Sequence, residues 1–291
     1  MFKLQIKYLS FFFGIVSILS FFNILYSYYF NLYLNLDTYY YTLITSSILF
    51  IVLFKFGKYD FKSNIFEKIL TIFLGYLLIP LVLSIPFYFS IYNLTFSNSF
   101  FEAISGFTST GFTVFDNIKL IDQSLIIWRS STQWIGGLYF LFSIIYLIDI
   151  YDDSFKKTLT NFISFNSSEI LKQATKIFIL YSSLTILIFV ILNIFSIRTF
   201  DSLNLALTII SSGGFLPVND LSMIIKENTQ IIIFSFMMLF SFFSLFFSYN
   251  LIFLRKKNVN FFYEDLHLFV YLVVVVTTFF LFFSFNYDFF I

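Results

Sequence analysis

The chain has 291 residues, of which 59% are hydrophobic, 24% are aromatic and only 11% are charged. An ordinary soluble domain carries roughly 25% charged residues, so the composition excludes that class and indicates a protein embedded in lipid. The formal net charge of +1 gives no reason to expect a nucleic-acid partner, and the absence of Cys excludes disulfides, thiolate metal sites and cysteine nucleophiles.

Seven stretches of the chain are long and apolar enough to cross a membrane as helices, because about 20 mainly apolar residues cover ~30 Å of hydrocarbon. In chain order they are residues 8–34, 39–56, 69–92, 124–150, 174–197, 230–254 and 266–285. The first stretch follows Lys3 and Lys7, but its apolar run is too long for a signal peptide, so we expect a retained helix.

Two shorter apolar stretches, residues 99–108 and 201–210, lie between neighbouring predicted spans. Each begins near a polar cap position, Asn98 or Asp201, and each is too short to cross the hydrocarbon, so we interpret them as pore helices. The predicted fold is therefore an all-α integral membrane protein with about seven transmembrane helices and two re-entrant segments, each a pore helix followed by a filter loop.

The basic residues predict the orientation of the chain, because cytoplasmic loops of membrane proteins retain Lys and Arg. With the N-terminus in the cytoplasm, thirteen of the seventeen basic residues lie inside. Only Lys119, Arg198 and Lys226 then lie outside, and Arg129 lies near the outer end of the fourth predicted span. We expect a multi-pass protein of the plasma membrane, which in bacteria is the inner membrane.

The sequence contains an internal repeat with an offset of 103 residues. At this offset the loop Thr108-Ser109-Thr110-Gly111 aligns with Ser211-Ser212-Gly213-Gly214, and each loop follows one of the short helices. A non-helical loop at membrane depth must be buried in protein or line a water-filled cavity, because its backbone groups have no partner in hydrocarbon. The repeat therefore marks both loops as candidate functional segments.

The composition of these two loops favours a site for a monovalent cation. Selectivity filters use backbone carbonyls in place of the hydration shell of an ion, and glycine permits the backbone conformations that this needs. Hard oxygen donors without a carboxylate suit a monovalent cation better than calcium or magnesium. The C-terminal ends of the pore helices would add a negative partial charge. The residues alone leave open whether the loops are simple turns between helices or an ion pathway.

Several segments of the chain resemble the Trk/Ktr/HKT superfamily of potassium transporters, and in particular its TrkH-like membrane subunits. Residues 101–111 (FEAISGFTSTG) look like the first pore helix and filter of that family. Residues 128–137 (WRSSTQWIGG) are similar to its Arg-x-x-x-Gln-Trp-hydrophobic-Gly-Gly motif at the start of the next helix. Residues 200–215 resemble the second filter, and Tyr263-Glu264-Asp265 resembles the entry to a third repeat.

The resemblance implies four helix-pore-helix repeats around one central pore, with potassium as the substrate and no cofactor. It implies that potassium is bound by the residues Thr108, Ser109, Thr110, Gly111, Ser211, Ser212, Gly213 and Gly214. In the related plant transporters, Ser in place of the first filter Gly accompanies sodium preference, so Gly111 implies potassium preference. Members of the family usually form dimers beside a cytoplasmic, nucleotide-binding regulatory subunit.

The same resemblance predicts the domain organisation. Residues 1–68 form two N-terminal transmembrane helices, residues 69–157 the first repeat, residues 158–257 the second repeat, and residues 258–291 the first helix of a third repeat. We therefore expect the chain to form a potassium pathway together with a further polypeptide that supplies the remaining repeats, or as a homodimer.

Two other functions stay open at this point. The chain could be a non-conducting remnant or an assembly subunit, or it could be an intramembrane enzyme. The enzyme is disfavoured because the predicted spans lack paired carboxylates, His pairs and other catalytic constellations.

Two groups of residues next to the first loop are expected to be structural. Arg129 is costly inside a membrane unless it faces protein or water, and we expect it to pair with Glu102 or Asp116 near the filter. Gly136 and Gly137 are expected to permit close helix packing.

Overall fold

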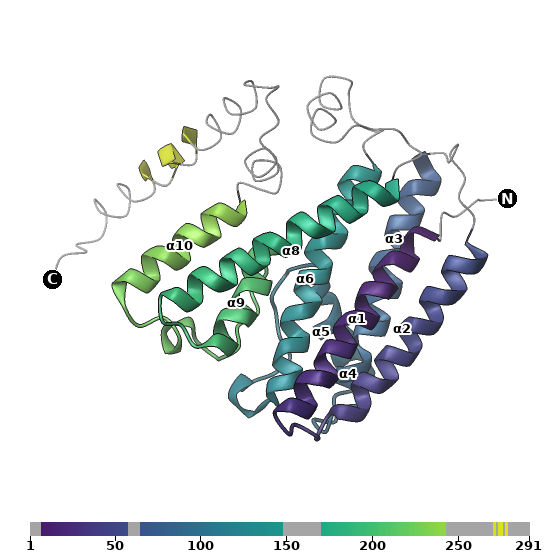
Figure 1. Ribbon diagram of the computed structural model, residues 1–291, viewed down its shortest axis with the longest axis horizontal. Helices are drawn as coiled ribbons and strands as arrows, with labels where there is room; N and C mark the ends of the chain where they lie inside the picture. The colour runs from purple at the N-terminus through teal and green to yellow at the C-terminus, as the bar shows by residue number, and fades with distance from the viewer. Residues whose placement is uncertain are drawn as a thin grey trace.

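A computed structural model describes residues 7–57, 65–147 and 170–242, together with parts of 270–278 (Figure 1). Every regular element in residues 7–57, 65–147 and 170–242 is helical, which fits the predicted all-α class. The helices are α1 (Lys7–Tyr29), α2 (Leu36–Phe56), α3 (Ile65–Leu83), α4 (Ile85–Tyr88), α5 (Phe96–Phe107), α6 (Gln123–Tyr146), α8 (Ile170–Ile194), α9 (Thr199–Ile210) and α10 (Asn228–Phe242), with the short 3-10 helices η1 (Ile118–Leu120) and η4 (Leu221–Met223).

Four of the described helical segments are long and apolar enough to cross a membrane. They are Tyr8–Tyr29, Leu36–Phe56, Ile65–Tyr88 and Ile177–Ile194, and they lie within four of the predicted spans or extend them by a few residues. The first span ends earlier than predicted, because the chain turns after α1 and Asn31 takes a left-handed conformation with a φ of 56°. The chain is an all-α membrane protein.

Of the remaining three predicted spans, one is less apolar than the four above, and two are described only in part. Helix α6 occupies the fourth predicted span and has 24 residues. Its first half carries several polar residues, and it is not among the four helices whose mean hydropathy suits a membrane span. Helix α10 covers the first part of the predicted span 230–254, and the rest of that span lies outside the described residues. The predicted span 266–285 also lies largely outside them.

The third predicted span is interrupted. Helix α3 ends at Leu83, and α4 begins directly after Ser84 with Pro86 in its first turn. Proline has no N–H group and its ring clashes with the carbonyl one turn earlier, so it is favoured in the first turn of a helix and costly in its interior. Pro80 occupies such an interior position within α3. The break at Ser84 places Pro86 where its missing N–H is harmless.

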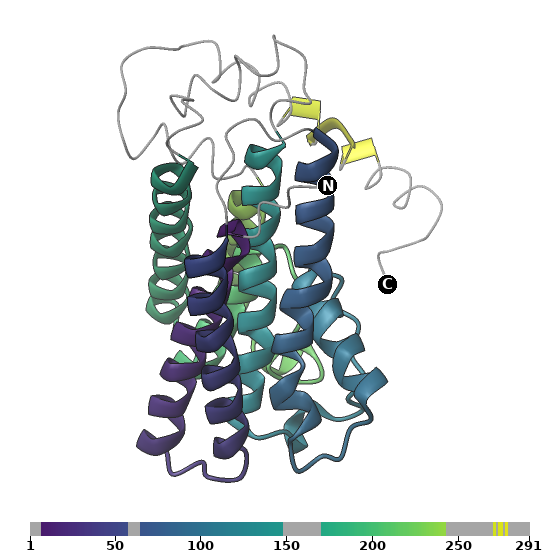
Figure 2. The same cartoon turned by 90° about the vertical axis from the view of Figure 1, so that its right-hand side faces the viewer.

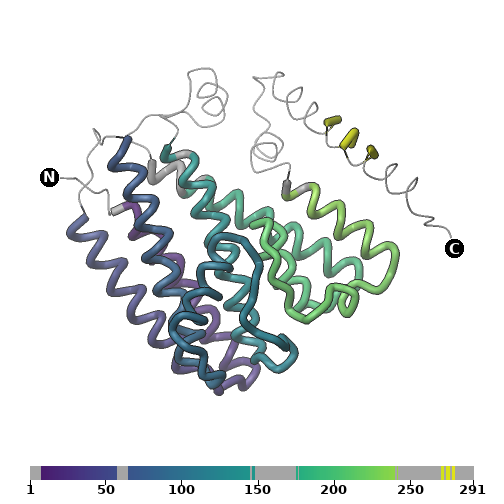
Figure 3. The backbone as a smooth tube through the Cα atoms, turned by 180° about the vertical axis from the view of Figure 1, so that it is seen from behind, coloured from purple at the N-terminus to yellow at the C-terminus, as the bar shows by residue number. Residues whose placement is uncertain are grey.

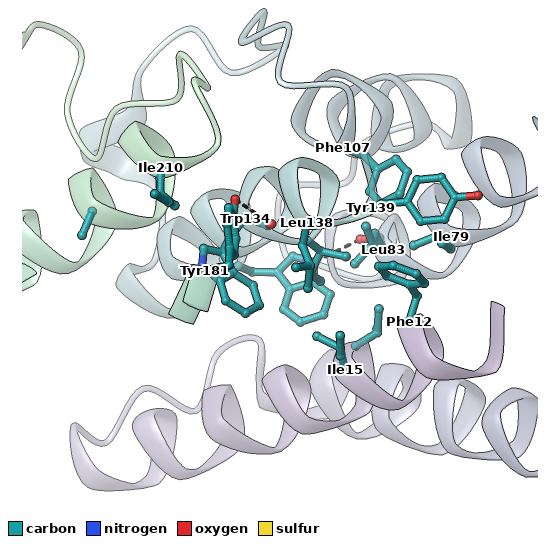
Figure 4. Packing of buried hydrophobic residues seen from close by; sticks show 14 of the residues in the cluster. Phe12, Ile15, Ile79, Leu83, Phe107, Trp134, Leu138, Tyr139, Tyr181 and Ile210 are labelled. Atoms are coloured by element: carbon teal, nitrogen blue, oxygen red, sulfur yellow. Dashed lines mark hydrogen bonds between the residues drawn. The ribbon is translucent and has the colours of Figure 1, made fainter. Parts of the chain in front are cut away.

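A core of large buried side chains packs α6 against α1, α3 and α8 (Figure 4). Tyr139 of α6 lies with its ring 4.8 Å from the ring of Phe12 in α1, and 5.3 Å from the ring of Phe107 at the end of α5. On the other side of α6, the Tyr181 hydroxyl donates to the Trp134 carbonyl at 3.1 Å. Helix α6 is therefore fixed on both sides, directly beside the short helix α5.

The predicted repeat is present in the backbone. The two short helices α5 and α9 each have 12 residues and lie in the same half of the molecule, and their bounds differ by the offset of 103 (Figures 1 and 2). Asn93 before α5 has a φ of 50°, and its counterpart Ser196 before α9 has a φ of 61°. Helices η1 and η4 also correspond at this offset. The repeat thus extends from the turn before each short helix to the segment after each loop.

Candidate functional site

The candidate site consists of two loops, the first loop (residues 108–114) after α5 and the second loop (residues 211–217) after α9. The second residue of each loop, Ser109 or Ser212, is left-handed, with φ values of 55° and 52°. Non-glycine residues seldom take this conformation and take it singly, so its occurrence at matching positions of both loops indicates one shared turn geometry.

Matching hydrogen bonds close both loops onto the helices before them. The Thr110 amide donates to the Ser105 carbonyl at 2.9 Å, and the Gly213 amide donates to the Thr208 carbonyl at 2.8 Å. Each bond uses a carbonyl in the last turn of a helix that would otherwise have no partner. The two loops are therefore structural counterparts, as the sequence offset predicts.

The segments after α5 and α9 lie side by side (Figure 3). The two loops meet at their glycines. A Cβ atom added to Gly111 would lie 2.8 Å from the Cα atom of Gly214, and Gly111 has a φ of +82°. A Cβ added to Gly214 would have ordinary contact at 3.4 Å with the Cα of Gly111. Only the first of the two positions therefore requires glycine for both space and backbone conformation.

The hydroxyl groups of the two loops are arranged differently. Thr108 and Thr110 are exposed, with their Oγ1 atoms 2.7 Å apart, and the Thr108 hydroxyl also lies 2.8 Å from the Ile104 carbonyl as a donor. Because a hydroxyl has one proton, Thr110 is then the donor within the pair. In the second loop Ser211 is buried and its Oγ lies 3.0 Å from the Thr208 carbonyl. The first loop therefore presents more side-chain oxygen to its surroundings.

A further contact joins the segments that follow the two loops. The Asn219 side chain accepts a hydrogen bond from the Ile118 amide at 2.7 Å and donates to the Asn117 Oδ1 at 3.2 Å. Sequence reasoning missed this contact. One signal was available, since Asn117 and Asp220 correspond at the offset of 103 and each caps a short 3-10 helix.

A buried ion pair lies behind the first loop. The Arg129 Nε of α6 lies 2.8 Å from a carboxylate oxygen of Glu102 in α5, and the two side chains are 1% and 0% exposed. Glu102 also accepts hydrogen bonds from the Thr113 hydroxyl and from the Val114 amide, at 3.0 and 2.9 Å. Of the two expected partners of Arg129, the structure brings Glu102 to it, whereas Asp116 is exposed.

Arg129 contacts both loops. One guanidinium nitrogen donates to the Thr113 hydroxyl of the first loop at 3.1 Å, and another donates to the Leu216 carbonyl of the second loop at 3.4 Å. The guanidinium carbon lies 4.3 Å from the ring centroid of Phe215, within cation–π distance. A single buried cation therefore links α5, the first loop and the second loop.

The glycines of the motif let α6 lie directly against both loops. A Cβ at Gly136 would overlap the carbonyl oxygen of Phe107, at the end of α5. A Cβ at Gly137 would lie 2.8 Å from the Cβ of Ser211, at the start of the second loop. The close packing expected of these glycines is thus between α6 and the ends of the two short helices.

Replacing Gly136 with alanine is expected to prevent normal folding, because the new methyl group would force α6 away from the backbone of α5. Overpacking of a buried site costs about 1–3 kcal/mol, and more where the neighbour is backbone. The yield of monodisperse protein in detergent should fall strongly. Gly14→Ala is the control, because its Cβ would meet only the side chain of Phe50, at 3.2 Å. Equal yields of the two variants would contradict this packing.

Comparison with known proteins gives relatives that are transporters. No family model matches the sequence. An uncharacterized cation transporter of Methanocaldococcus jannaschii is 27% identical over 175 residues, which cover 57% of this chain and 35% of that protein. The Trk system potassium uptake protein TrkH of Salmonella typhimurium is 26% identical over 165 residues, covering 54% of this chain and 34% of that protein. The Escherichia coli Trk system potassium uptake protein TrkG is 44% identical over 46 residues, covering 16% of this chain and 10% of that protein.

The fold matches a solved structure. The crystal structure of the potassium transporter TrkH from Vibrio parahaemolyticus aligns with a TM-score of 0.67 and 17% sequence identity, over 82% of this chain and 49% of that chain. This chain thus spans about half of the solved structure and about a third of the first two curated relatives. These relatives are transporters and not enzymes. Over part of its length, this chain is a relative of the TrkH-like membrane proteins of the Trk potassium uptake systems.

Proposed function

We propose that this chain is a pore-forming subunit of a Trk-type potassium uptake system. In this proposal, residues 108–111 and 211–214 are filter segments that bind potassium, the substrate, as it passes, and no cofactor takes part. The observation that carries the proposal is the meeting of two loops of the same backbone geometry at Gly111 and Gly214.

The length of the short helices supports a re-entrant arrangement. A helix of 12 residues is only about 18 Å long, so α5 and α9 do not reach across the hydrocarbon. In this proposal, the loop after each short helix returns the chain toward the side from which that helix started. We place both loops on the outer side of a bacterial inner membrane, with a cytoplasmic N-terminus and about seven spans, as the basic residues predict.

The exposed surface of the first loop supports a further partner. Thr108 and Thr110 are exposed, and so is the large side chain of Phe112. Exposed backbone and hydroxyl groups at membrane depth need protein or water around them. We infer that the surrounding bilayer is separated from these loops by further filter segments, supplied by another polypeptide or by a second copy of this chain. A cytoplasmic nucleotide-binding regulatory subunit is a second inferred partner.

Uptake by a potassium-transport-deficient cell tests the proposal. We expect growth on low potassium when this chain is expressed together with the remaining repeats of a TrkH-type protein, and no growth with either part alone. Barium-sensitive potassium flux from the purified chain alone in liposomes would contradict the need for a second polypeptide and favour a homodimer. Absence of flux in every combination would favour the non-conducting assembly subunit.

A further inference from the structure

Gln133 is a fully buried polar side chain of α6 that contacts the second loop. It follows Arg129 by one helical turn and is 0% exposed. Its Oε1 accepts a hydrogen bond from the Phe215 amide at 3.2 Å. A Cβ added to Gly213 would lie 2.8 Å from Nε2 of Gln133 and closer still to Oε1. The side-chain amide therefore lies directly against the backbone of the second loop.

The hydrogen bond fixes which end of the Gln133 amide faces the loop. A backbone N–H is a donor only, so the atom facing Phe215 must be the oxygen. The Nε2 atom of Gln133 has no hydrogen-bond partner among the described residues. Gln133 thus accepts one hydrogen bond from the second loop and fills the space beside Gly213.

This bond acts on the neighbouring filter carbonyl. The amide nitrogen of Phe215 and the carbonyl of Gly214 belong to the same planar, trans peptide unit, in which N–H and C=O point in opposite directions. Fixing the N–H toward Gln133 therefore directs the Gly214 carbonyl away from α6. Gly214 itself is exposed, as expected of a residue whose carbonyl points away from α6.

The repeat has no equivalent support at the corresponding position. The residue that matches Gln133 at the offset of 103 is Phe236 of α10, which is 62% exposed. Phe112, which matches Phe215 at this offset, is held from its own short helix, where the Ser105 hydroxyl donates to the Phe112 carbonyl at 2.6 Å. The second loop thus depends on a side chain from the first repeat.

We propose that Gln133 is a positioning residue for ion selectivity, which sets the direction of the Gly214 carbonyl through the Phe215 amide. The proposal rests on the proposed function, because it assigns a role in selecting the transported ion. The direction of a carbonyl determines how well a filter replaces the hydration shell of an ion. A loop in which the Gly214–Phe215 peptide can rotate should therefore discriminate less between potassium and sodium.

Two variants and two measurements test the role of Gln133. Gln133→Met keeps the length of the side chain but leaves the Phe215 amide without an acceptor, whereas Gln133→Glu keeps an acceptor oxygen in either protonation state. Ser143→Ala is the matched control, because Ser143 is also buried on α6 and its hydroxyl donates at 2.7 Å to Tyr139 of the same helix. We measure amide hydrogen exchange in the purified chain, and potassium-to-sodium selectivity in the transporting complex.

For Gln133→Met we expect exchange of the Phe215 amide to become about tenfold faster, the effect of one lost hydrogen bond, with the first loop unchanged. Selectivity should fall several-fold, and Gln133→Glu should recover part of both effects. Unchanged exchange in residues 211–217 would overturn the positioning role. Faster exchange with unchanged selectivity would overturn the role in selectivity. If the unmodified complex transports no potassium, the proposed function fails, while hydrogen exchange still decides whether Gln133 positions the loop.

Discussion

Replacing Gly111 with serine is expected to lower the potassium-to-sodium selectivity of a transporting complex by about tenfold. Gly111 has a φ of +82°, and a Cβ there would lie 2.8 Å from the Cα of Gly214. A left-handed conformation costs a residue with a Cβ roughly 1–2 kcal/mol, and about 1.4 kcal/mol corresponds to a factor of ten. The loop must therefore move, and the carbonyls that replace the hydration shell of the ion move with it.

Gly214→Ser is the matched control for this prediction. It adds the same side chain to the corresponding loop, but its Cβ would have only ordinary contact, at 3.4 Å from the Cα of Gly111. Ion fluxes of both variants in proteoliposomes, under equal gradients of potassium and sodium, give the two ratios. Gly214 also lies in a proposed filter segment, so its variant should lose some selectivity, but less than Gly111→Ser. An unchanged ratio for Gly111→Ser would exclude Gly111 as a filter residue, and equal losses in both would contradict the asymmetry of the two positions.

The local features of this fold could be predicted from the sequence because they depend on length and periodicity. The short helices α5 and α9 are bounded by polar residues and are too short to span the bilayer, and the offset of 103 aligns their following loops residue by residue. The pairing of Arg129 with Glu102 could also be expected, because an isolated charge is costly in that environment and few acidic residues lie nearby in the sequence.

Contacts between the two repeats could not be predicted in this way. The hydrogen bond from Phe215 to Gln133 and the bridge between Asn117 and Asn219 join residues 82 and 102 positions apart. The repeat aligns Asn117 with Asp220, but it does not specify which residue of the other repeat either one contacts. The polar residues of α6 also belong to such contacts between the repeats. The sequence predicts a span here, but not that polar side chains fill its first half, where Arg129 and Gln133 are buried against the two loops.

The second large effect is expected at the buried ion pair. Arg129→Met removes the cation and leaves the Glu102 carboxylate, which is 0% exposed, without its charged partner. Breaking a buried pair in this way costs about 3–5 kcal/mol, because the remaining charge has lost its water and its counter-charge. The variant should give little folded protein, and its melting temperature in detergent, followed by fluorescence-detected size exclusion, should fall far below that of the unmodified chain.

An exposed ion pair of the same chain provides the control for this prediction. Arg198 and Asp201 are paired at 3.0 Å at the start of α9, but the Arg198 side chain is 61% exposed. Water screens such a pair, so Arg198→Met should cost no more than about 1 kcal/mol. A similar fall in melting temperature for the two Arg→Met variants would show that burial of the first pair does not matter.

The double variant Glu102→Gln/Arg129→Met separates the lost charge from the lost contacts of Arg129. If the cost comes from an uncompensated carboxylate, the neutral amide should restore much of the stability, since Gln can still accept hydrogen bonds from Thr113 and Val114. If the double variant is as unstable as Arg129→Met, the cost comes instead from the contacts that the guanidinium makes with both loops. In that case Arg129 acts mainly as the link to Thr113 and the Leu216 carbonyl, and its pairing with Glu102 is secondary.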